Sequence, residues 1–202
     1  MRESLRFLAA FLRRPGSVGS VLPSSAALSR AMVAGIAAGR GGSILEFGPG
    51  TGPVTAEILK ALARPGHGPL RRSYLGIERE PSFVRLLRRR FPRARFVAAS
   101  AEDAEAECRK AGLAPVQAVI SSLPFASLPA GVQDGVIRCL GRLVRRGCEF
   151  RTYQYVHAYL LPAASRFRRR LDDRLGRHRR LAVIAGNVPP AFVLSWRRPS
   201  TR

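Results

Sequence analysis

The stretch that decides the fold is Ile44-Leu45-Glu46-Phe47-Gly48-Pro49-Gly50-Thr51-Gly52, a short apolar run that passes directly into a glycine-rich turn. An amphipathic pattern follows it, so these residues predict a strand, a tight turn and a helix. Glycines let the backbone turn tightly and approach a ligand closely, and the helix that follows offers free N–H groups at its start. We therefore predict that Gly48, Gly50 and Thr51 contact a cofactor, with a turn used only for packing as the alternative.

Two acidic residues indicate which cofactor this turn would bind. Glu46 stands just before the glycines, where dinucleotide folds avoid a carboxylate because a pyrophosphate lies there. Its carboxylate could instead pair with the ammonium of an amino acid moiety, as S-adenosylmethionine requires. Glu78 ends the next strand pattern, where a carboxylate can accept hydrogen bonds from both hydroxyls of a ribose. Together the two acids favour S-adenosylmethionine as the cofactor.

The alternation of patterns along the chain predicts an α/β fold. From Ser43 onward, apolar runs alternate with amphipathic stretches, which is typical of parallel strands joined by crossover helices. The predicted strands are Ser43–Phe47, Ser73–Glu78, Arg95–Ala99, Val116–Ser121, Cys148–Tyr155, Leu181–Ala185 and Ala191–Trp196. The predicted helices are Val54–Leu62, Ser82–Arg90, Ala104–Ala111, Val132–Val144 and Ala163–Leu175. Pro189 and Pro190 cannot continue a ladder, so the last two strands are expected to form a hairpin.

The acidic glycine turn resembles that of the class I S-adenosylmethionine-dependent methyltransferases. Within that superfamily, three segments together resemble the bacterial phospholipid N-methyltransferases, which methylate phosphatidylethanolamine. These segments are Val18-Gly19-Ser20-Val21-Leu22-Pro23-Ser24-Ser25, Ser121-Ser122-Leu123-Pro124-Phe125 and Asn187-Val188-Pro189-Pro190-Ala191. The resemblance implies a Rossmann-like, seven-stranded, mostly parallel sheet with helices on both faces and a reversed last strand. It also implies that Ser20 and Ser122 contact the cofactor.

The pattern along the chain predicts two regions, with amphipathic helices and a loop over 1–40 and the methyltransferase domain over 41–202. One motif departs from the family, which usually carries Gly-Asp-Ala after the third strand, whereas Ala99-Ser100-Ala101 stands here. The adenine contact must then come from the backbone at Ser100 and Ala101 or from the side chain of Glu102. The acidic residues after Ser100 also form an ordinary acidic helix start, which is the alternative.

The methyl-transfer point is expected at Ser121-Ser122-Leu123-Pro124-Phe125, because ligands of open α/β sheets bind at the carboxyl ends of strands. Leu123, Pro124 and Phe125 are the predicted substrate contacts, and an ordinary strand-ending turn is the alternative. The related ribosomal RNA adenine dimethyltransferases carry Asn-Leu-Pro-Tyr here, using the Asn and the aromatic ring to hold a flipped adenine. Ser122 and Phe125 replace both, so RNA adenine methylation is the second hypothesis.

Aromatic residues follow the fifth predicted strand. Tyr153, Tyr155 and His157 alternate, so we expect them to share one face. The resembling family has a tyrosine in a Gln-Phe-Thr-Tyr run, which residues 152–155 match in part. Tyr155 is therefore the predicted catalytic contact to the headgroup, with Tyr153 beside it in the substrate site. Core packing of these rings is the alternative.

The charge of the chain points to a partner that carries phosphates. Its 202 residues hold 35 Lys plus Arg against 13 Asp plus Glu, a net charge of +22, which attracts an anionic membrane surface or nucleic acid. A coding bias toward arginine is the alternative. Residues 4–14 place Leu5, Leu8, Phe11 and Leu12 at the spacing of an interfacial helix, with packing of this stripe on the protein itself as the alternative. Residues 166–180 hold eight arginines, with an ordinary solvated face as the alternative.

No metal site is predicted, because the three cysteines form no CxxC pair and the three histidines are scattered. No run of about 18 uncharged apolar residues occurs that could span a membrane. The sequence thus predicts a cytoplasmic enzyme, peripherally associated with the inner membrane, that methylates phosphatidylethanolamine and its methylated intermediates. An RNA adenine N-methyltransferase and a non-catalytic lipid- or RNA-binding relic of the fold are the alternatives.

Overall fold

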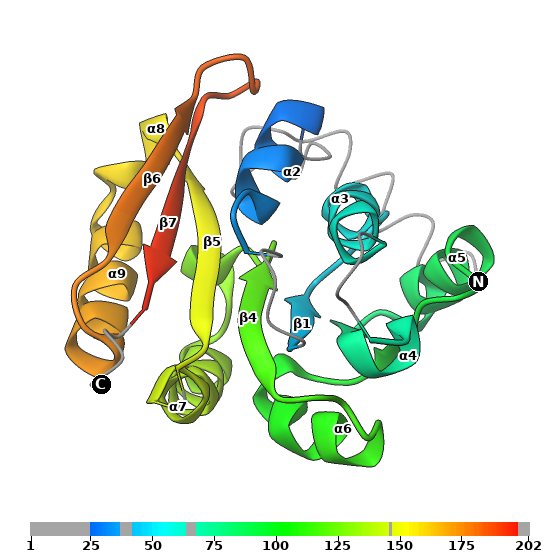
Figure 1. Cartoon of the computed structure of the whole chain (residues 1–202). Helices are drawn as coiled ribbons and strands as arrows, with labels where there is room; N and C mark the ends of the chain where they lie inside the picture. The colour runs from blue at the N-terminus through cyan, green and yellow to red at the C-terminus, as the bar shows by residue number, and fades with distance from the viewer. Residues whose placement is uncertain (1–24, 37–41, 64–67, 146, 198–202) are drawn as a thin grey trace.

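A computed structural model describes residues 25–36, 42–63, 68–145 and 147–197. These residues form a seven-stranded sheet in the order β3-β2-β1-β4-β5-β7-β6, which confirms the predicted fold (Figure 1). The strands from β3 to β5 are parallel, and β7 runs antiparallel to both of its neighbours. The strands are β1 (Ser43–Phe47), β2 (Tyr74–Glu78), β3 (Phe96–Ala98), β4 (Val116–Ser121), β5 (Glu149–Tyr155), β6 (Arg179–Ile184) and β7 (Ala191–Trp196).

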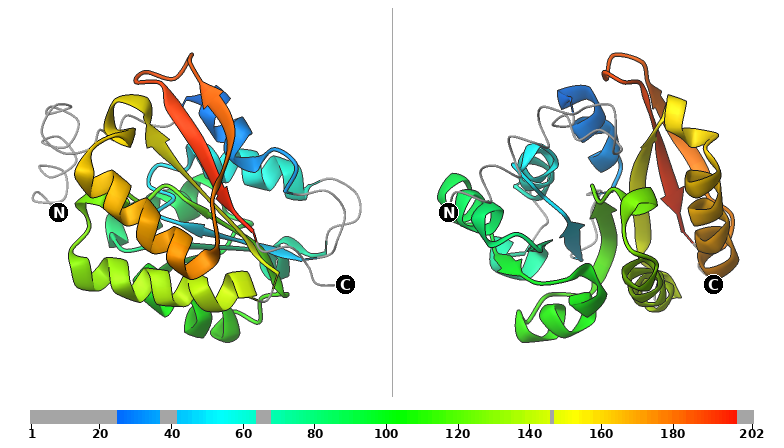
Figure 2. Two further views of the ribbon diagram at one scale, coloured as in Figure 1. Left: turned by 90° about the vertical axis from the view of Figure 1, so that its left-hand side faces the viewer. Right: turned by 180° about the vertical axis from the view of Figure 1, so that it is seen from behind.

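Helices cover both faces of this sheet (Figure 2). On one face lie α2 (Ala26–Val33), α3 (Pro53–Leu62) and α5 (Pro81–Arg90), and on the other lie α6 (Ala104–Lys110), α7 (Ala130–Arg145) and α9 (Pro162–Leu175). Shorter helical segments that the sequence did not predict are α4 (Leu70–Ser73), η1 (Ala101–Asp103), η2 (Phe125–Ser127) and α8 (Val156–Tyr159). No helix among the described residues is long and apolar enough to cross a membrane.

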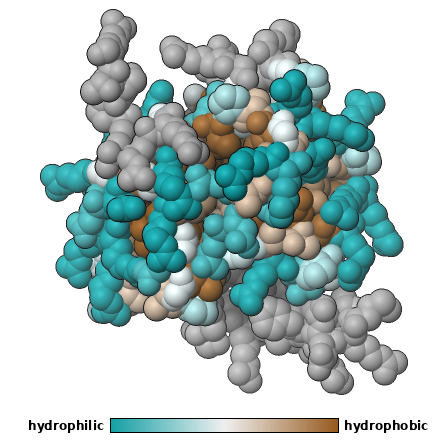
Figure 3. Space-filling model, turned by 90° about the horizontal axis from the view of Figure 1, so that it is seen from below, coloured by the Kyte–Doolittle hydropathy of each residue, from teal (hydrophilic) through white to brown (hydrophobic). Residues whose placement is uncertain are grey.

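The burial of the central strand β1 explains the apolar run that predicts it in the sequence. All five of its residues are buried, because both of its faces are covered by helices. Leu45 and Phe47 belong to the apolar core under α7 and α9, while Ile44 belongs to the core under α2 and α3. Hydrophilic side chains instead project from the outer surface, as on the lower face of the molecule (Figure 3).

Helix α2 is fixed to the sheet at both of its ends. At its start, the backbone N–H of Ser25 donates to Asn187 Oδ1 at 3.0 Å, and Asn187 Nδ2 donates to Pro189 O at 2.6 Å. At its end, Arg151 Nη1 donates to Ala34 O at 2.6 Å, and the same guanidinium pairs with Glu149. The β6–β7 connection and β5 therefore determine where α2 lies.

We predict that Asn187→Ala lowers the free energy of unfolding by about 1–3 kcal/mol, because it leaves the start of α2 without its hydrogen-bond partner. Asn187 is only 3% exposed, so water cannot readily replace the lost bonds. Chemical denaturation measures the change. Val188→Ala is the matched control, since Val188 is 75% exposed and its truncation should change stability little. Equal stability of the two variants would contradict the prediction.

Candidate active site

The carboxyl ends of β1, β2 and β4 meet at one edge of the sheet. Backbone hydrogen bonds fix this junction: Gly48 N donates to Ile77 O at 2.9 Å, and Ser122 N donates to Phe47 O at 3.0 Å. The glycine turn therefore lies between the end of β2 and the segment after β4. This is the position at which open α/β sheets bind ligands.

Two glycines in this turn have different structural roles. Gly48 has a φ of +64°, and a Cβ there would lie 2.7 Å from Leu123 Cδ2, so the turn and the segment after β4 touch. Gly50 has a φ of +57°, and no atom of the described residues lies within 4 Å of where its Cβ would be. The space above Gly50 is thus open to a ligand. The half-buried Thr51, which follows, accepts a hydrogen bond at its carbonyl from Arg90 Nη1 at 2.7 Å.

Glu46 is fully buried at the centre of a polar cluster. Its Oε2 accepts hydrogen bonds from Thr55 Oγ1 at 2.8 Å and from the Tyr74 hydroxyl at 2.5 Å. Its Oε1 is buried and has no hydrogen-bond partner among the described residues. Sequence analysis did not identify Thr55 and Tyr74, because neither residue type marks such a role outside the folded arrangement. The cluster links β1, β2 and α3.

Burial changes how Glu46 titrates. Loss of hydration raises the pKa of its carboxyl from 4.5 to about 7, although the hydrogen bonds from Tyr74 and Thr55 oppose the rise. The pKa of Tyr74 is raised well above its ordinary value by burial and by the charge of Glu46. An ammonium group that donates a hydrogen bond to Oε1 would satisfy the unpaired oxygen and favour the ionised carboxylate. The cluster therefore fits the amino acid end of S-adenosylmethionine.

Glu78 lies at the end of β2, beside the glycine turn. Its Oε2 accepts a hydrogen bond from Gly50 N at 3.1 Å, and its Oε1 accepts one from Glu80 N at 3.0 Å. These bonds hold the half-buried carboxylate next to the open space above Gly50. Because each carboxylate oxygen has two lone pairs, Glu78 can still accept hydrogen bonds from ribose hydroxyls.

The residues proposed for adenine lie at the end of β3. Ser100 Oγ donates to Glu102 Oε2 at 3.0 Å, and Ala101 is buried beside them in the core. The Glu102 side chain lies against Gly135 of α7, where a Cβ would be only 2.0 Å from Glu102 Oε1. The structure thus brings Ser100, Ala101 and Glu102 to the same edge as the glycine turn, with Glu102 held toward α7.

The segment after β4 is divided between the edge and the core. Ser121 Oγ accepts a hydrogen bond from Leu123 N at 3.2 Å, which turns Leu123 toward Gly48. Pro124 then leads into η2, and the ring of Phe125 points inward, where it stacks on Phe167 with centroids 4.6 Å apart. Phe125 is only 4% exposed. Its ring packs the core, and we assign it no contact with substrate.

The aromatic residues at the end of β5 and in α8 form a row of rings. Tyr153 and Tyr155 have centroids 5.6 Å apart, and the rings of Tyr155 and His157 stack at 5.7 Å. The fifth strand ends at Tyr155 as predicted, and His157 lies beyond it in α8. Tyr153 is partly exposed, whereas Tyr155 is buried. The predicted site residue Ser20 lies outside the described residues, as does the predicted helix over 4–14.

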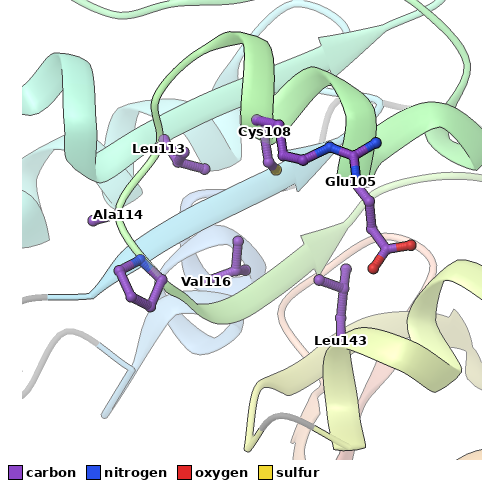
Figure 4. A pocket seen from close by; sticks show the side chains of 8 residues that line it. Glu105, Cys108, Leu113, Ala114, Val116 and Leu143 are labelled. Carbon is purple, nitrogen blue, oxygen red and sulfur yellow. The ribbon is translucent and has the colours of Figure 1, made fainter.

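A cavity of about 280 Å³ lies away from this edge, where β4 begins (Figure 4). It is lined by Cys108 of α6, Val116 of β4 and Leu143 of α7, among others. Burial raises the pKa of the Cys108 thiol to about 11, so it stays protonated and is a poor nucleophile near neutral pH. Among the described residues, no group of three or more His, Cys, Asp or Glu side chains is arranged to hold a metal ion.

No model of a protein family matches the chain. Among curated proteins, it is 33% identical over 147 residues to an ornithine lipid N-methyltransferase of Singulisphaera acidiphila, covering 71% of this chain and 73% of that protein.

Solved structures share the fold. A TehB-like S-adenosylmethionine-dependent methyltransferase from Corynebacterium glutamicum is 13% identical, with a TM-score of 0.57 over 98% of this chain and 100% of that one. A T. thermophilus 16S rRNA methyltransferase, solved with AdoMet and guanosine, is 19% identical, with a TM-score of 0.59 over 91% of this chain and 45% of that one. An O-methyltransferase from Bacillus cereus in complex with SAH is 13% identical, with a TM-score of 0.57 over 96% and 89%.

The raised pKa of Glu46 predicts an unusual pH dependence of stability. The folded protein holds this proton up to a pH of about 7, while the unfolded chain releases it near 4.5. The free energy of unfolding should therefore fall as the pH rises through this window, by about 3 kcal/mol from this group. Denaturation of the wild type and Glu46→Gln at several pH values isolates the contribution, because Gln does not titrate.

The control is Glu57→Gln. Glu57 lies on the same helix as Thr55, and its carboxylate pairs with Lys60 at 2.8 Å. It should keep the wild-type pH dependence. An equal change in the free energy of unfolding for the wild type and Glu46→Gln across this window would show that Glu46 does not titrate as described.

Proposed function

Since this chain belongs to the class I S-adenosylmethionine-dependent methyltransferases, and its methyl donor is S-adenosylmethionine, we propose that it methylates the amine of a membrane lipid. The observation that carries this proposal is its 33% identity over 147 residues to an ornithine lipid N-methyltransferase. Phosphatidylethanolamine, which the sequence predicts as acceptor, and an ornithine lipid both offer an amine nitrogen. The proposed reaction class is therefore N-methylation at a lipid headgroup.

Four groups would hold the donor at the edge of the sheet. Glu46 would accept a hydrogen bond from the amino group at its unpaired Oε1, and Glu78 would accept hydrogen bonds from the ribose hydroxyls. The open space above Gly50 would admit the ligand against the backbone. The backbone at Ser100 and Ala101, or the Glu102 carboxylate, would contact adenine. When bound, S-adenosylmethionine supplies a methyl group activated by a sulfonium.

The acceptor would be aligned by the segment after β4 and by the ring row at the end of β5. An amine is nucleophilic only after its ammonium has lost a proton, so the headgroup must bind as the free base. Ser122 and Leu123 border the glycine turn, and Pro124 follows them. Tyr155 is the proposed contact to the headgroup, with the more exposed Tyr153 beside it. Alignment of the two reactants would supply much of the acceleration.

Transfer of a labelled methyl group tests the acceptor class. We expect label from S-adenosylmethionine to enter phosphatidylethanolamine or ornithine lipid presented in detergent micelles, and not total RNA. Tyr155→Phe should lower the rate while leaving donor affinity unchanged, because the proposed contact is to the headgroup. Thin-layer chromatography of the lipid fraction identifies which lipid takes up the label.

Label in RNA alone would favour the second hypothesis, RNA adenine N-methylation. Donor binding without transfer to either fraction would favour a non-catalytic relic of the fold. Either result would overturn the lipid proposal.

The proposed donor contacts predict a loss of affinity. Glu46→Gln and Glu78→Gln should each weaken binding of S-adenosylhomocysteine by about tenfold to a hundredfold, because each removes the charge from a charge-assisted hydrogen bond. Titration calorimetry measures the affinity, and thermal unfolding checks that both variants remain folded. Glu57→Gln, outside the site, serves as control. Wild-type affinity in both folded variants would remove the basis for these assignments.

A further inference from the structure

Two segments that lie side by side near the candidate site hold no Asp, Glu, Lys or Arg. They span residues 152–165 and 181–196, in a chain of which 24% is charged. The first contains the end of β5, α8 and the start of α9, and the second contains most of β6 and all of β7. A hydrogen bond of 2.8 Å from Val156 N to Pro190 O joins α8 to the β6–β7 connection.

These segments expose apolar side chains to solvent. Among the described residues, six of the seven large apolar side chains counted as exposed lie within them. We name five of these the apolar rim: Val156, Leu160, Leu161, Val183 and Val188. Leu160 is 84% exposed, Val188 is 75% exposed and Leu161 is 54% exposed. Clustered exposure of this kind marks an interaction surface, whereas single exposed apolar residues are ordinary.

The corner that carries Leu160 is held in place by its neighbours. Tyr159 contacts Phe192 with ring centroids 4.8 Å apart, and the guanidinium of Arg168 lies 3.6 Å from the centroid of the Tyr159 ring. The Tyr159 hydroxyl is also 3.1 Å from Nε2 of His178. Because these contacts fix α8, the exposure of Leu160 and Leu161 belongs to the folded structure.

The apolar rim borders the edge that contains the candidate site. α8 follows directly on Tyr155 at the carboxyl end of β5, and both α8 and the β6–β7 connection stand at the top of Figure 1. On the lower face, hydrophilic side chains project around apolar areas (Figure 3). A ligand embedded in a membrane on the side of the rim would reach the ring row at the end of β5 from this end of the molecule.

Arginines flank the apolar rim on α9 and β6. Arg166, Arg169 and Arg180 are exposed, and no ion pair among the described residues includes Arg166 or Arg169. Guanidinium groups bind phosphates with paired hydrogen bonds. Apolar side chains beside a basic border are the arrangement with which peripheral proteins enter the headgroup region of an anionic bilayer.

We propose that the apolar rim is the surface by which this protein docks on an anionic lipid bilayer, with its flanking arginines at the lipid phosphates. This inference rests on the proposed lipid acceptor, because docking there turns the methyl-transfer edge toward the headgroups. A second copy of the chain is disfavoured as occupant, since each copy has a net charge of +22 and carries arginines beside the same surface.

The first test removes apolar side chains from the rim. Leu160→Ser combined with Leu161→Ser should lower partitioning onto phosphatidylethanolamine and phosphatidylglycerol vesicles by about tenfold or more, because less apolar surface enters the bilayer. Cosedimentation at physiological salt measures the partitioning. Leu86→Ser is the matched control, since Leu86 of α5 is 43% exposed and lies outside the rim. It should bind vesicles like the wild type.

The second test reverses the charge beside the rim. Arg166→Glu combined with Arg169→Glu should weaken vesicle binding about tenfold or more, as two attractive charges near the anionic surface become repulsive. The same exchange at Arg85 and Arg89, which are exposed on α5, is the matched control. Binding by that control should remain well above that of the rim variant, although both lose the same net charge.

Three results would overturn the docking surface. Vesicle binding of the leucine variant equal to that of Leu86→Ser would place docking elsewhere. A lower melting temperature with weaker binding of S-adenosylhomocysteine would show that the leucines pack within the protein. A concentration-dependent dimer that the leucine substitutions dissolve would assign the rim to a second copy.

Vesicle binding and methyl transfer can fail separately. Rim-dependent binding without labelled lipid would support the surface and overturn the lipid acceptor. Labelled lipid in micelles, together with vesicle binding that does not depend on the rim, would support the lipid acceptor and overturn the docking surface. Where both proposals hold, the leucine variant should keep its rate on micelles and lose it on vesicles.

Discussion

The rest of the site depends on one buried carboxylate. Glu46 accepts hydrogen bonds from Thr55 of α3 and Tyr74 of β2, so one side chain connects the strand before the glycine turn, the helix after it and the neighbouring strand. A carboxyl in this environment is expensive to ionise, and its pKa rises accordingly to about 7. Packing alone would not require such a group. A ligand that completes the hydrogen bonding of Glu46 would explain why a carboxylate occupies the centre of the fold.

The glycine turn connects this buried cluster to the open edge of the sheet. Gly48 lets the segment after β4 approach closely, which places the proposed substrate contacts beside the turn proposed to bind the donor. Gly50 leaves open space beside Glu78, whose carboxylate is held there by two backbone N–H groups. Polar groups that are positioned before a ligand arrives lose little conformational entropy on binding it. The edge of the sheet is thus organised without help from the ligand.

The two faces of the sheet contribute differently to function. On one face, α2 is clamped by Asn187 and Arg151, so the β6–β7 connection and the start of α2 have fixed relative positions. Beyond the end of β5, the apolar rim extends from α8 to the β6–β7 connection, and α9 carries arginines beside it. Because the hairpin is joined to both α2 and α8, the proposed docking surface and the proposed methyl-transfer edge lie at the same end of the molecule.

The sequence by itself determined the seven strands, the five main helices after the glycine turn and the closing hairpin. Local periodicity determines these elements, and in the buried strand β1 Glu46 is the single acid, with apolar residues on both sides of it. Only the tertiary structure decided the rest. Phe125 turned inward because Phe167, 42 residues away in the chain, offered a ring to stack on. Thr55 and Tyr74 became partners of Glu46 because β1, β2 and α3 converge. The apolar rim likewise joins two segments separated along the chain, and pairing of that kind is fixed by packing, which periodicity does not encode.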